Sequence, residues 1–274
     1  MRLRFEFAGL HTDTQLMSNL NERQQFLRDA NTAPASSTIA WASRRRRITD
    51  AAWKYGFNRH LKKHGMTREA LGPDYVRRLE LAGLPIDTLD DVLAGVRHRD
   101  DWVRVWELEG NRYAADNAHE QACAAYYMAQ RWLFIDGSTR ARMYDQATHH
   151  YGLMDHPAEL ERVDIDVNGR RVAGLLQIPA SATPAPLMVL FPGLTATKEE
   201  MHPLAVGLLA RGIAVCRVDL PGFGETSGYI DEAPTILSTG VISQLMEDPR
   251  IDASRVYAAG FCTGGMYAAT AAYT

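Results

Sequence analysis

The spacing of hydrophobic residues changes once along the chain, near residue 160. Before that point, apolar residues recur at three- and four-residue intervals over Thr38–His64, over Thr67–Ala82 and from Leu89 onward, which predicts helices. The stretch Trp102–Phe134 is dense in alanine and aromatic residues, a composition that favours paired helices packed closely through their small side chains. We therefore predict an all-helical domain over residues 1–158.

From residue 159 to residue 274 the pattern predicts an α/β domain. Val163–Val167 alternates apolar and polar residues, Asn168-Gly169 is a hairpin signal, and a second apolar run follows over Val172–Ile178. Continuous apolar strands then alternate with helices, which is typical of a parallel sheet covered on both faces. The predicted strands are Leu187–Phe191, Ile213–Asp219 and Arg255–Gly260, and the predicted helices are Lys198–Arg211, a segment within 232–247, and Thr263 to the end.

Composition and charge narrow the classes of partner. The 274 residues include 30 Lys and Arg against 33 Asp and Glu, a net charge of −3, which gives no reason to expect nucleic acid. No apolar run reaches the roughly 18 residues of a membrane helix, and Glu6 interrupts the N-terminus before a signal-peptide core forms. We expect a cytoplasmic protein without membrane contact. His60 and His64 have the spacing of a metal pair but no third ligand, so we expect neither a metal nor a cofactor.

The sharpest chemical signal is the sequence G-x-C-x-G-G at Gly260–Gly265, between a predicted strand and a predicted helix. This is the nucleophile-elbow pattern with cysteine in the place usually held by serine. A tight turn there would lift Cys262 clear of the sheet at a helix N-terminus, where the dipole favours a thiolate, and would aim the Thr263 N–H at an oxyanion. The alternative interpretation is a glycine-rich structural turn with a buried cysteine.

The other two cysteines have a different setting. Cys123 lies between alanines in a predicted helix, and Cys216 lies in a predicted strand. With an odd number of cysteines and no export signal, a disulfide framework is not expected. We predict that Cys123 and Cys216 are inert core residues and that Cys262 is the reactive thiol.

Two further loops follow predicted strands and reach the same edge of the sheet. The first, Pro192–Glu200, ends in a helix cap formed by Thr197 and Glu200. The second runs from Asp219 to Glu225 with the sequence D-L-P-G-F-G-E. Glu225 could contact a substrate there, and a solvated carboxylate fits the sequence equally well.

Together these motifs resemble the α/β-hydrolase superfamily. They are most similar to its branch with a helical N-terminal domain: the FrsA-like esterases, 2,6-dihydroxypseudooxynicotine hydrolase and the fungal Ayg1-type hydrolases. That branch carries G-G-L-x-x-x-K-E-E, D-x-P-G-x-G-E and G-x-S-x-G-G in this order, which correspond here to Pro192–Glu200, Asp219–Glu225 and Gly260–Gly265. The resemblance covers roughly residues 100–274. It implies that the Leu194 N–H is the second oxyanion donor beside that of Thr263.

The resemblance also implies a reaction. Cys262 would attack the acyl carbon of an ester, a thioester or an activated ketone, and water would release the acid from an acyl-enzyme. Cysteine at the nucleophile position is similar to dienelactone hydrolases and to bile-acid-CoA acyltransferases and thioesterases. Acyl transfer to an amine or alcohol is therefore the first alternative, and a non-catalytic binding protein is the second.

The superfamily takes its catalytic acid and histidine from loops that follow later strands, so motif position assigns neither residue within these 274 residues. Without such a strand, the elbow strand would have an unpaired apolar edge. We expect either a homo-oligomer or a longer polypeptide, acting on a small-molecule acyl substrate. We also expect the helical domain to act as a lid, with aromatic residues of Trp102–Phe134 lining the pocket above Cys262.

Overall fold

The structure is a computed structural model that describes residues 55–56, 58–98, 100–131, 137–180, 184–194, 196–226, 228 and 234–271. The chain divides into two compact units, Met1–Phe57 and Asn58–Thr274, and the description below concerns the second. Most of the predicted helix Thr38–His64 lies outside the described residues. The second unit contains both helices and a sheet, and the domain boundary at residue 158 stays a prediction.

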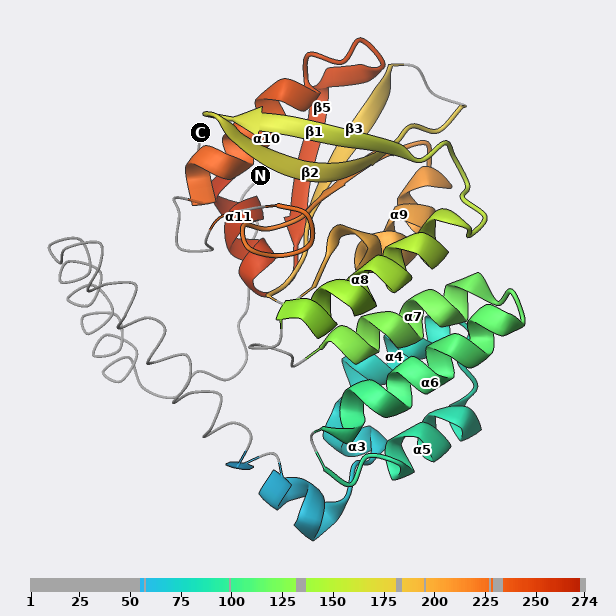
Figure 1. Cartoon of the computed structure of the whole chain (residues 1–274). Coiled ribbons are helices and arrows are strands. Elements are labelled where there is room, and N and C mark those ends of the chain that lie inside the picture. The colour runs from blue at the N-terminus through green and yellow to red at the C-terminus, as the bar shows by residue number, and fades with distance from the viewer. Residues whose placement is uncertain are drawn as a thin grey trace, which may run out of the picture. The chain divides into compact units, whose positions relative to one another are not determined.

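The helical part consists of short helices followed by three longer ones (Figure 1). They are α3 (Arg68–Leu71), α4 (Pro73–Leu81), α5 (Ile86–Ala94), α6 (Asp101–Ala115), α7 (His119–Gln130) and α8 (Gly137–Gly152). The helical segment predicted over Thr67–Ala82 forms two helices, α3 and α4. It is interrupted at Gly72, which has a φ of 95°, and α4 restarts at Pro73, whose ring fixes φ and whose nitrogen donates no hydrogen bond.

Helices α6 and α7 pack against each other as their composition predicts. A side chain at Gly110 of α6 would put its Cβ 2.8 Å from the ring of Tyr126 on α7, so the two helices meet where glycine leaves room. Trp102, Trp106 and Tyr126 are buried, and the Trp102 indole N–H donates to the Met128 carbonyl at 2.6 Å. Large aromatic side chains thus fill the centre of the helical part.

The sheet has five strands in the order β1-β2-β4-β3-β5. The strands are β1 (Glu161–Val167), β2 (Arg170–Gln177), β3 (Ala185–Phe191), β4 (Ala214–Val218) and β5 (Ile251–Gly260). The predicted hairpin is confirmed: Asn168 and Gly169, with φ of 56° and 79°, join the antiparallel pair β1–β2. Strands β3, β4 and β5 are parallel, as their continuous apolar sequences predict, while β2 joins β4 antiparallel.

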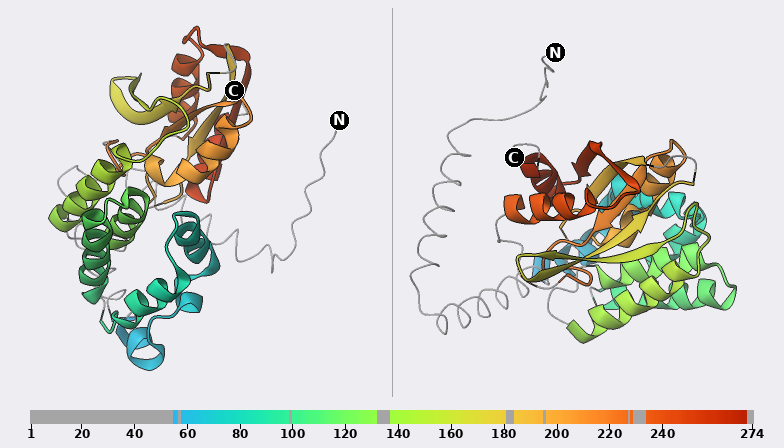
Figure 2. Two further views of the ribbon diagram at one scale, coloured as in Figure 1. Left: turned by 90° about the vertical axis from the view of Figure 1, so that its right-hand side faces the viewer. Right: turned by 90° about the horizontal axis from the view of Figure 1, so that it is seen from above.

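Helices cover both faces of this sheet (Figure 2). Side chains of α10 (Pro234–Leu245) and α11 (Thr263–Ala271) share one core with β1, β3 and β4, and α9 (His202–Leu209) packs on the other face against Leu190 and Val215. The α/β fold class is therefore confirmed. The helix predicted over Lys198–Arg211 instead opens with the 3-10 turn η1 (Lys198–Met201) and ends at Leu209.

The helical part lies against the segment that follows β3. Arg131, just after α7, forms an ion pair with Glu200 of η1, and Tyr144 of α8 donates from its hydroxyl to Glu199 at 3.2 Å. Since η1 begins beyond the carboxyl end of β3, α7 and α8 pack at this end of the parallel strands (Figure 1). Ligands of open parallel sheets bind at the same edge. In the part of the chain that the structure describes, no helix is both long and apolar enough to span a bilayer.

Candidate active site

Cys262 occupies a strained turn between β5 and α11. Its φ is 50°, in the left-handed region that residues other than glycine seldom adopt. The turn is closed by Gly264 N–H donating to the Phe261 carbonyl at 2.8 Å and by Gly265 N–H donating to the Cys262 carbonyl at 3.0 Å. The side chain is exposed. This is the geometry of a nucleophile elbow, a sharp strand-to-helix turn that presents one side chain to solvent.

The glycines on either side of the turn are required by close backbone approaches. A Cβ at Gly260 would lie 2.2 Å from the carbonyl oxygen of Gly264, and one at Gly264 would lie 2.1 Å from that of Phe191. A Cβ at Gly265 would meet nothing closer than 3.4 Å. The motif therefore contains two glycines that permit the turn and one that tolerates a side chain.

The loop after β3 lies directly beside the elbow. Phe261 N–H donates to the Phe191 carbonyl at 3.3 Å, and a Cβ at Gly193 would lie 3.7 Å from the Cβ of Cys262. Leu194, the next residue, is 48% exposed. Among the described residues, the backbone N–H groups of Leu194 and Thr263 have no hydrogen-bond acceptor. Both predicted oxyanion donors thus remain available.

The other two cysteines are buried, as the sequence predicts. Cys123 packs inside α7 and Cys216 inside β4. Burial raises the pKa of the Cys123 thiol well above its ordinary value, and it raises the pKa of Cys216 to about 12. Both therefore remain neutral thiols near neutral pH. Cys262 differs from them in being exposed to solvent.

Asp219 joins the two loops that follow β3 and β4. It is fully buried, and one carboxylate oxygen accepts the Lys198 backbone N–H at 2.8 Å. The other oxygen accepts Lys198 Nζ at 2.7 Å and the Glu225 N–H at 2.9 Å. A Cβ at Gly224 would collide with this carboxylate at 2.1 Å, and Gly224 has a positive φ of 52°. The loop Asp219–Glu225, with the sequence D-L-P-G-F-G-E, therefore folds back so that its last residues contact the carboxylate of Asp219.

Lys198 is the centre of a buried ionic cluster. Its Nζ lies 2.9 Å from Glu199, 2.7 Å from Asp219 and 2.7 Å from Glu225. Burial alone lowers the pKa of Lys198, but these carboxylates outweigh burial and raise it. Burial, reinforced by the charge of Glu199, raises the pKa of Asp219 to about 7 although Lys198 opposes the shift. The cluster holds the end of the loop after β3 against both the sheet and α8.

Glu225, the predicted substrate contact, belongs partly to this cluster. One oxygen pairs with Lys198 and the other with Arg162 of β1, and 27% of the side chain is exposed. Burial raises the pKa of its carboxyl, but hydrogen bonds and charges from Lys198 and Arg162 outweigh burial and lower it. Glu225 also lines a pocket of about 400 Å³ together with Arg140 and Tyr144 of α8. Glu225 is therefore not simply a solvated carboxylate, because it forms two ion pairs and also lines a pocket.

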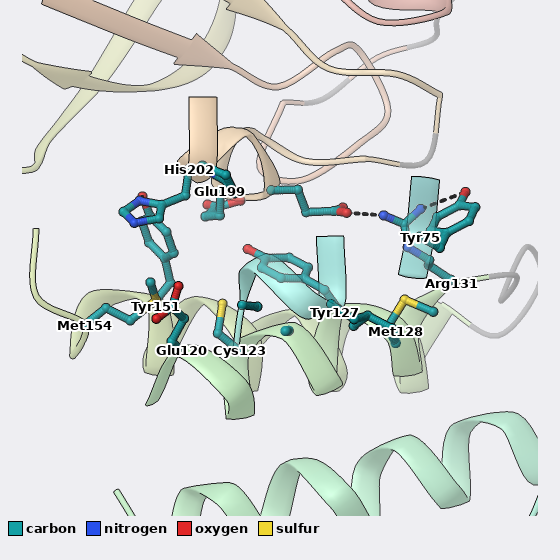
Figure 3. A pocket seen from close by; sticks show the side chains of 15 residues that line it. Tyr75, Glu120, Cys123, Tyr127, Met128, Arg131, Tyr151, Met154, Glu199 and His202 are labelled. Atoms are coloured by element: carbon teal, nitrogen blue, oxygen red, sulfur yellow. Dashed lines mark hydrogen bonds and ion pairs between the residues drawn. The ribbon is translucent and has the colours of Figure 1, made fainter. Parts of the chain in front are cut away.

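A second pocket lies where α4 and α7 meet η1 and α9 (Figure 3). Tyr127 and Cys123 line it from α7, and His202 lines it from α9. Cys262 lines neither of these two pockets. Of the predicted lid residues, Tyr127 thus lines a pocket that Cys262 does not line. Trp132 and Phe134 lie outside the described residues. The lid stays a prediction.

Sequence reasoning did not predict the pairing of Lys198 with Asp219. The signal was present, since Lys198 follows β3, Asp219 follows β4, and these strands are neighbours in the sheet. Carboxyl ends of adjacent parallel strands bring such residues together. Among the described residues, no group of histidine, cysteine, aspartate and glutamate side chains has the geometry to hold a metal ion.

Comparison with known protein families agrees with this geometry. A family model described as "Esterase FrsA-like" matches residues 95–274. The esterase FrsA of Vibrio cholerae serotype O1 is 26% identical over 176 residues, covering 60% of this chain and 42% of that protein. The esterase FrsA of Shigella sonnei is 28% identical over 208 residues, covering 68% of this chain and 49% of that protein. The chain thus spans about half the length of the curated relatives that it matches.

Solved structures give the same result for the fold. The crystal structure of 2,6-dihydroxy-pseudo-oxynicotine hydrolase is similar with a TM-score of 0.52 and 25% identity, covering 67% of this chain and 56% of that chain. The structure of AbyA5 has a TM-score of 0.57 and 23% identity, covering 72% of this chain and 58% of that chain. The resemblance to α/β hydrolases inferred from the three motifs is therefore confirmed.

Proposed function

Because the chain belongs to the FrsA-like esterase family, we propose that it carries the nucleophile of an acyl hydrolase and that this nucleophile is the thiol of Cys262. The observation that carries the proposal is the elbow itself. An exposed thiol lies on a positive-φ turn directly before α11, next to the Thr263 N–H, which has no hydrogen-bond acceptor among the described residues. Residue strain of this kind clusters at functional sites.

The loop after β3 supports the second half of the proposal. A Cβ at Gly193 would lie 3.7 Å from the Cβ of Cys262, and Leu194 is the next residue of the loop. This close approach supports the Leu194 N–H as the second donor. Two backbone donors from separate segments, one on each side of the attacked carbonyl, are what an oxyanion hole requires. The ion pairs of Lys198 with Glu199, Asp219 and Glu225 fix the end of this loop. The Leu194 N–H is therefore held in position before a substrate binds.

The proposed reaction proceeds in two steps. The Cys262 thiolate attacks the acyl carbon, the Leu194 and Thr263 N–H groups bind the resulting oxyanion, and the leaving group departs with its electron pair and takes up a proton. Water then adds to the thioester, and its collapse returns the thiolate and releases the acid. Esters, thioesters and ketones with an activated C–C bond all fit this scheme. Because thiolate is already nucleophilic, the first step depends less on a general base than attack by a serine hydroxyl does.

The helical part is proposed to act as a lid over this edge of the sheet. The supporting observation is the pocket that Glu225 shares with Arg140 and Tyr144 of α8, since it joins the loop after β4 to the helical part. Glu225 then serves as a polar contact for the substrate.

Limited alkylation tests the central residue. The full chain is treated with substoichiometric iodoacetamide, with and without prior incubation with an acyl thioester, and the peptides are mapped by mass. We expect the Cys262 peptide to be modified first and the thioester to protect it. Cys262→Ala is the negative control, and Cys216→Ala is the matched variant that should leave the pattern unchanged. Equal labelling of all three cysteines, or faster labelling of Cys123, would contradict the proposal.

The fate of the acyl group separates the two enzyme classes. With a thioester donor and an added amine, hydrolysis gives the free acid and acyl transfer gives the amide. We expect the free acid to dominate. Amide as the main product would reassign the same nucleophile to an acyltransferase.

A further inference from the structure

The pocket between α7 and the η1–α9 segment has no part in the proposed reaction. It is lined by neither Cys262 nor Glu225, and it has a volume of about 80 Å³, several times what one water molecule occupies. Figure 3 shows Glu199 and His202 on one side of it and Cys123 and Tyr127 on the other. The pocket is therefore large enough for a small organic molecule.

Most of its wall is apolar. The apolar and aromatic residues that line it come from α4, from α7, from the end of α8 and the segment after it, and from the start of α9, and they include Leu79, Cys123, Tyr127, Tyr151, Met154 and Pro203. Such a wall favours a ligand with a short hydrocarbon body and few polar groups.

Three buried polar atoms of residues in this wall have no hydrogen-bond partner among the described residues: the Tyr127 hydroxyl, Arg131 Nε and Glu199 Oε2. The carboxylate oxygen of Glu199 is the charged acceptor among them. Glu199 is 2% exposed, and its Oε1 accepts the Tyr144 hydroxyl at 3.2 Å and lies 2.9 Å from Lys198 Nζ. Its Oε2 is buried and has no hydrogen-bond partner among the described residues. An unpaired buried carboxylate oxygen is costly, so a ligand that donates a hydrogen bond there would gain free energy.

The charges around the pocket favour a cation. Glu120, Glu199 and Glu200 line it, and Arg131, also in the wall, pairs with Glu200. Lys198 pairs with Glu199 through Oε1 alone, so the lining carboxylates still outnumber the cations paired with them. His202 adds no positive charge at neutral pH, because burial lowers the pKa of its imidazole to about 4. Tyrosine rings in the wall offer further attraction to an ammonium group.

We propose that this pocket binds a small primary ammonium ion with a short aliphatic chain. The ammonium group donates to Glu199 Oε2, and the chain lies against Cys123, Tyr127 and the other apolar residues of the wall. Anions of the same shape are excluded by Glu120 and Glu199. This site is independent of the nucleophile at the elbow.

Isothermal titration calorimetry of the full chain tests the proposal with three probes of similar shape: n-butylammonium, 1-butanol and butyrate. We expect n-butylammonium to bind saturably and at least about tenfold more tightly than 1-butanol, since a charge-assisted hydrogen bond replaces a neutral one. Butyrate should not bind. Butanol or butyrate binding as tightly as n-butylammonium would overturn the proposal, and so would no saturable binding of n-butylammonium.

Variants locate the site. Glu199→Gln should bind 1-butanol as the wild type does and lose the preference for n-butylammonium, and the retained butanol binding shows that the pocket is still formed. Ala124→Leu should fill the pocket and remove both interactions. Ala141→Leu, on the wall of the other pocket, and Cys262→Ala should leave them unchanged. A Glu199→Gln protein that still prefers n-butylammonium would contradict the assignment.

Discussion

The elbow at Cys262 and the ionic cluster at Lys198 lie at the same edge of the sheet and are built by opposite means. The elbow is held by backbone: glycines at 260 and 264 let the main chain of three segments approach within hydrogen-bonding distance. The cluster is held by side chains: the buried Lys198 ammonium pairs with the buried carboxylates of Asp219 and Glu199 and with the partly exposed carboxylate of Glu225. The elbow is strained and exposed, whereas the cluster is held by ion pairs and is largely buried.

The two constructions suit two different requirements of an acyl-transfer site. A nucleophile has to be accessible, so its position is fixed through the backbone and its side chain is left free. The loop that supplies an oxyanion donor has to remain in place while charge develops, and a buried network can hold it. The predictions below test whether the two regions depend on these different contacts.

The largest effect on stability is expected at Gly264, where the backbone of the elbow passes close to the backbone of Phe191. Gly264→Ala places a methyl group 2.1 Å from the Phe191 carbonyl oxygen, and neither backbone can move without breaking the turn. We expect the free energy of unfolding to fall by more than about 4 kcal/mol, measured by urea denaturation. Gly265→Ala is the matched control, with its Cβ at 3.4 Å, and should cost less than about 1 kcal/mol. An equal loss of stability in both variants would mean that the close approach to Phe191 is not the reason for glycine at position 264.

Removing the ammonium of the cluster comes next. Lys198→Met leaves Asp219 and Glu199 buried without their cation, and we expect a loss of about 3–4 kcal/mol of stability. Adding Asp219→Asn to this variant should restore part of the loss, because one uncompensated charge disappears. Lys62→Met, at an exposed position, serves as the control. A Lys198→Met protein as stable as the wild type would show that the cluster does not hold the loop.

A smaller, pH-dependent effect is expected at His202. Its pKa is lowered from 6.5 to about 4, first by burial and then by Arg217 and His156. The folded state therefore favours the neutral ring, and this contribution is present above about pH 6.5 and lost as the pH falls toward 4. It amounts to about 2–3 kcal/mol. Comparing unfolding at pH 7.5 and pH 4.5, His202→Gln should lose less stability than the wild type on acidification, whereas the exposed His60→Gln should match the wild type.

The smallest effect concerns the outer edge of the elbow strand. In the described sheet β5 pairs with β3 on one side, and Tyr257, Phe261 and Met266 near it are exposed by 52%, 46% and 47%. We propose that this edge promotes self-association of the 274-residue chain. Sedimentation velocity should show Tyr257→Lys shifted toward monomer relative to the wild type, with Leu108→Lys on α6 as the control. A monodisperse wild-type monomer would contradict the proposal.

The two regions also differ in how far the sequence predicts them. The Asn168-Gly169 hairpin, the parallel strands and the elbow follow from local patterns, because each depends on neighbouring residues and on glycine. The cluster joins residues from β1, η1 and the loop after β4, and only the neighbouring positions of β3 and β4 bring them together. No local pattern contains that information.

The remaining errors have local physical causes. Strand β5 begins at Ile251 rather than near Arg255, because Ile251 pairs with Ala185 before an irregularity and the regular register resumes at Val256. The first turn after the β3 loop is 3-10 rather than α, although the predicted capping box is formed, with Thr197 N–H donating to Glu200 Oε1 at 3.2 Å. Hydrophobic spacing does not distinguish such terminal geometries.

If Cys262 forms an acyl-enzyme, that intermediate can be trapped. The full chain is mixed with an activated acyl thioester, quenched in acid and mapped by peptide mass spectrometry, with Cys262→Ala beside it. We expect a single acyl group on the peptide that contains Cys262 and none in the variant. An acyl group on the Cys123 or Cys216 peptide instead, or the same acylation in Cys262→Ala, would contradict it.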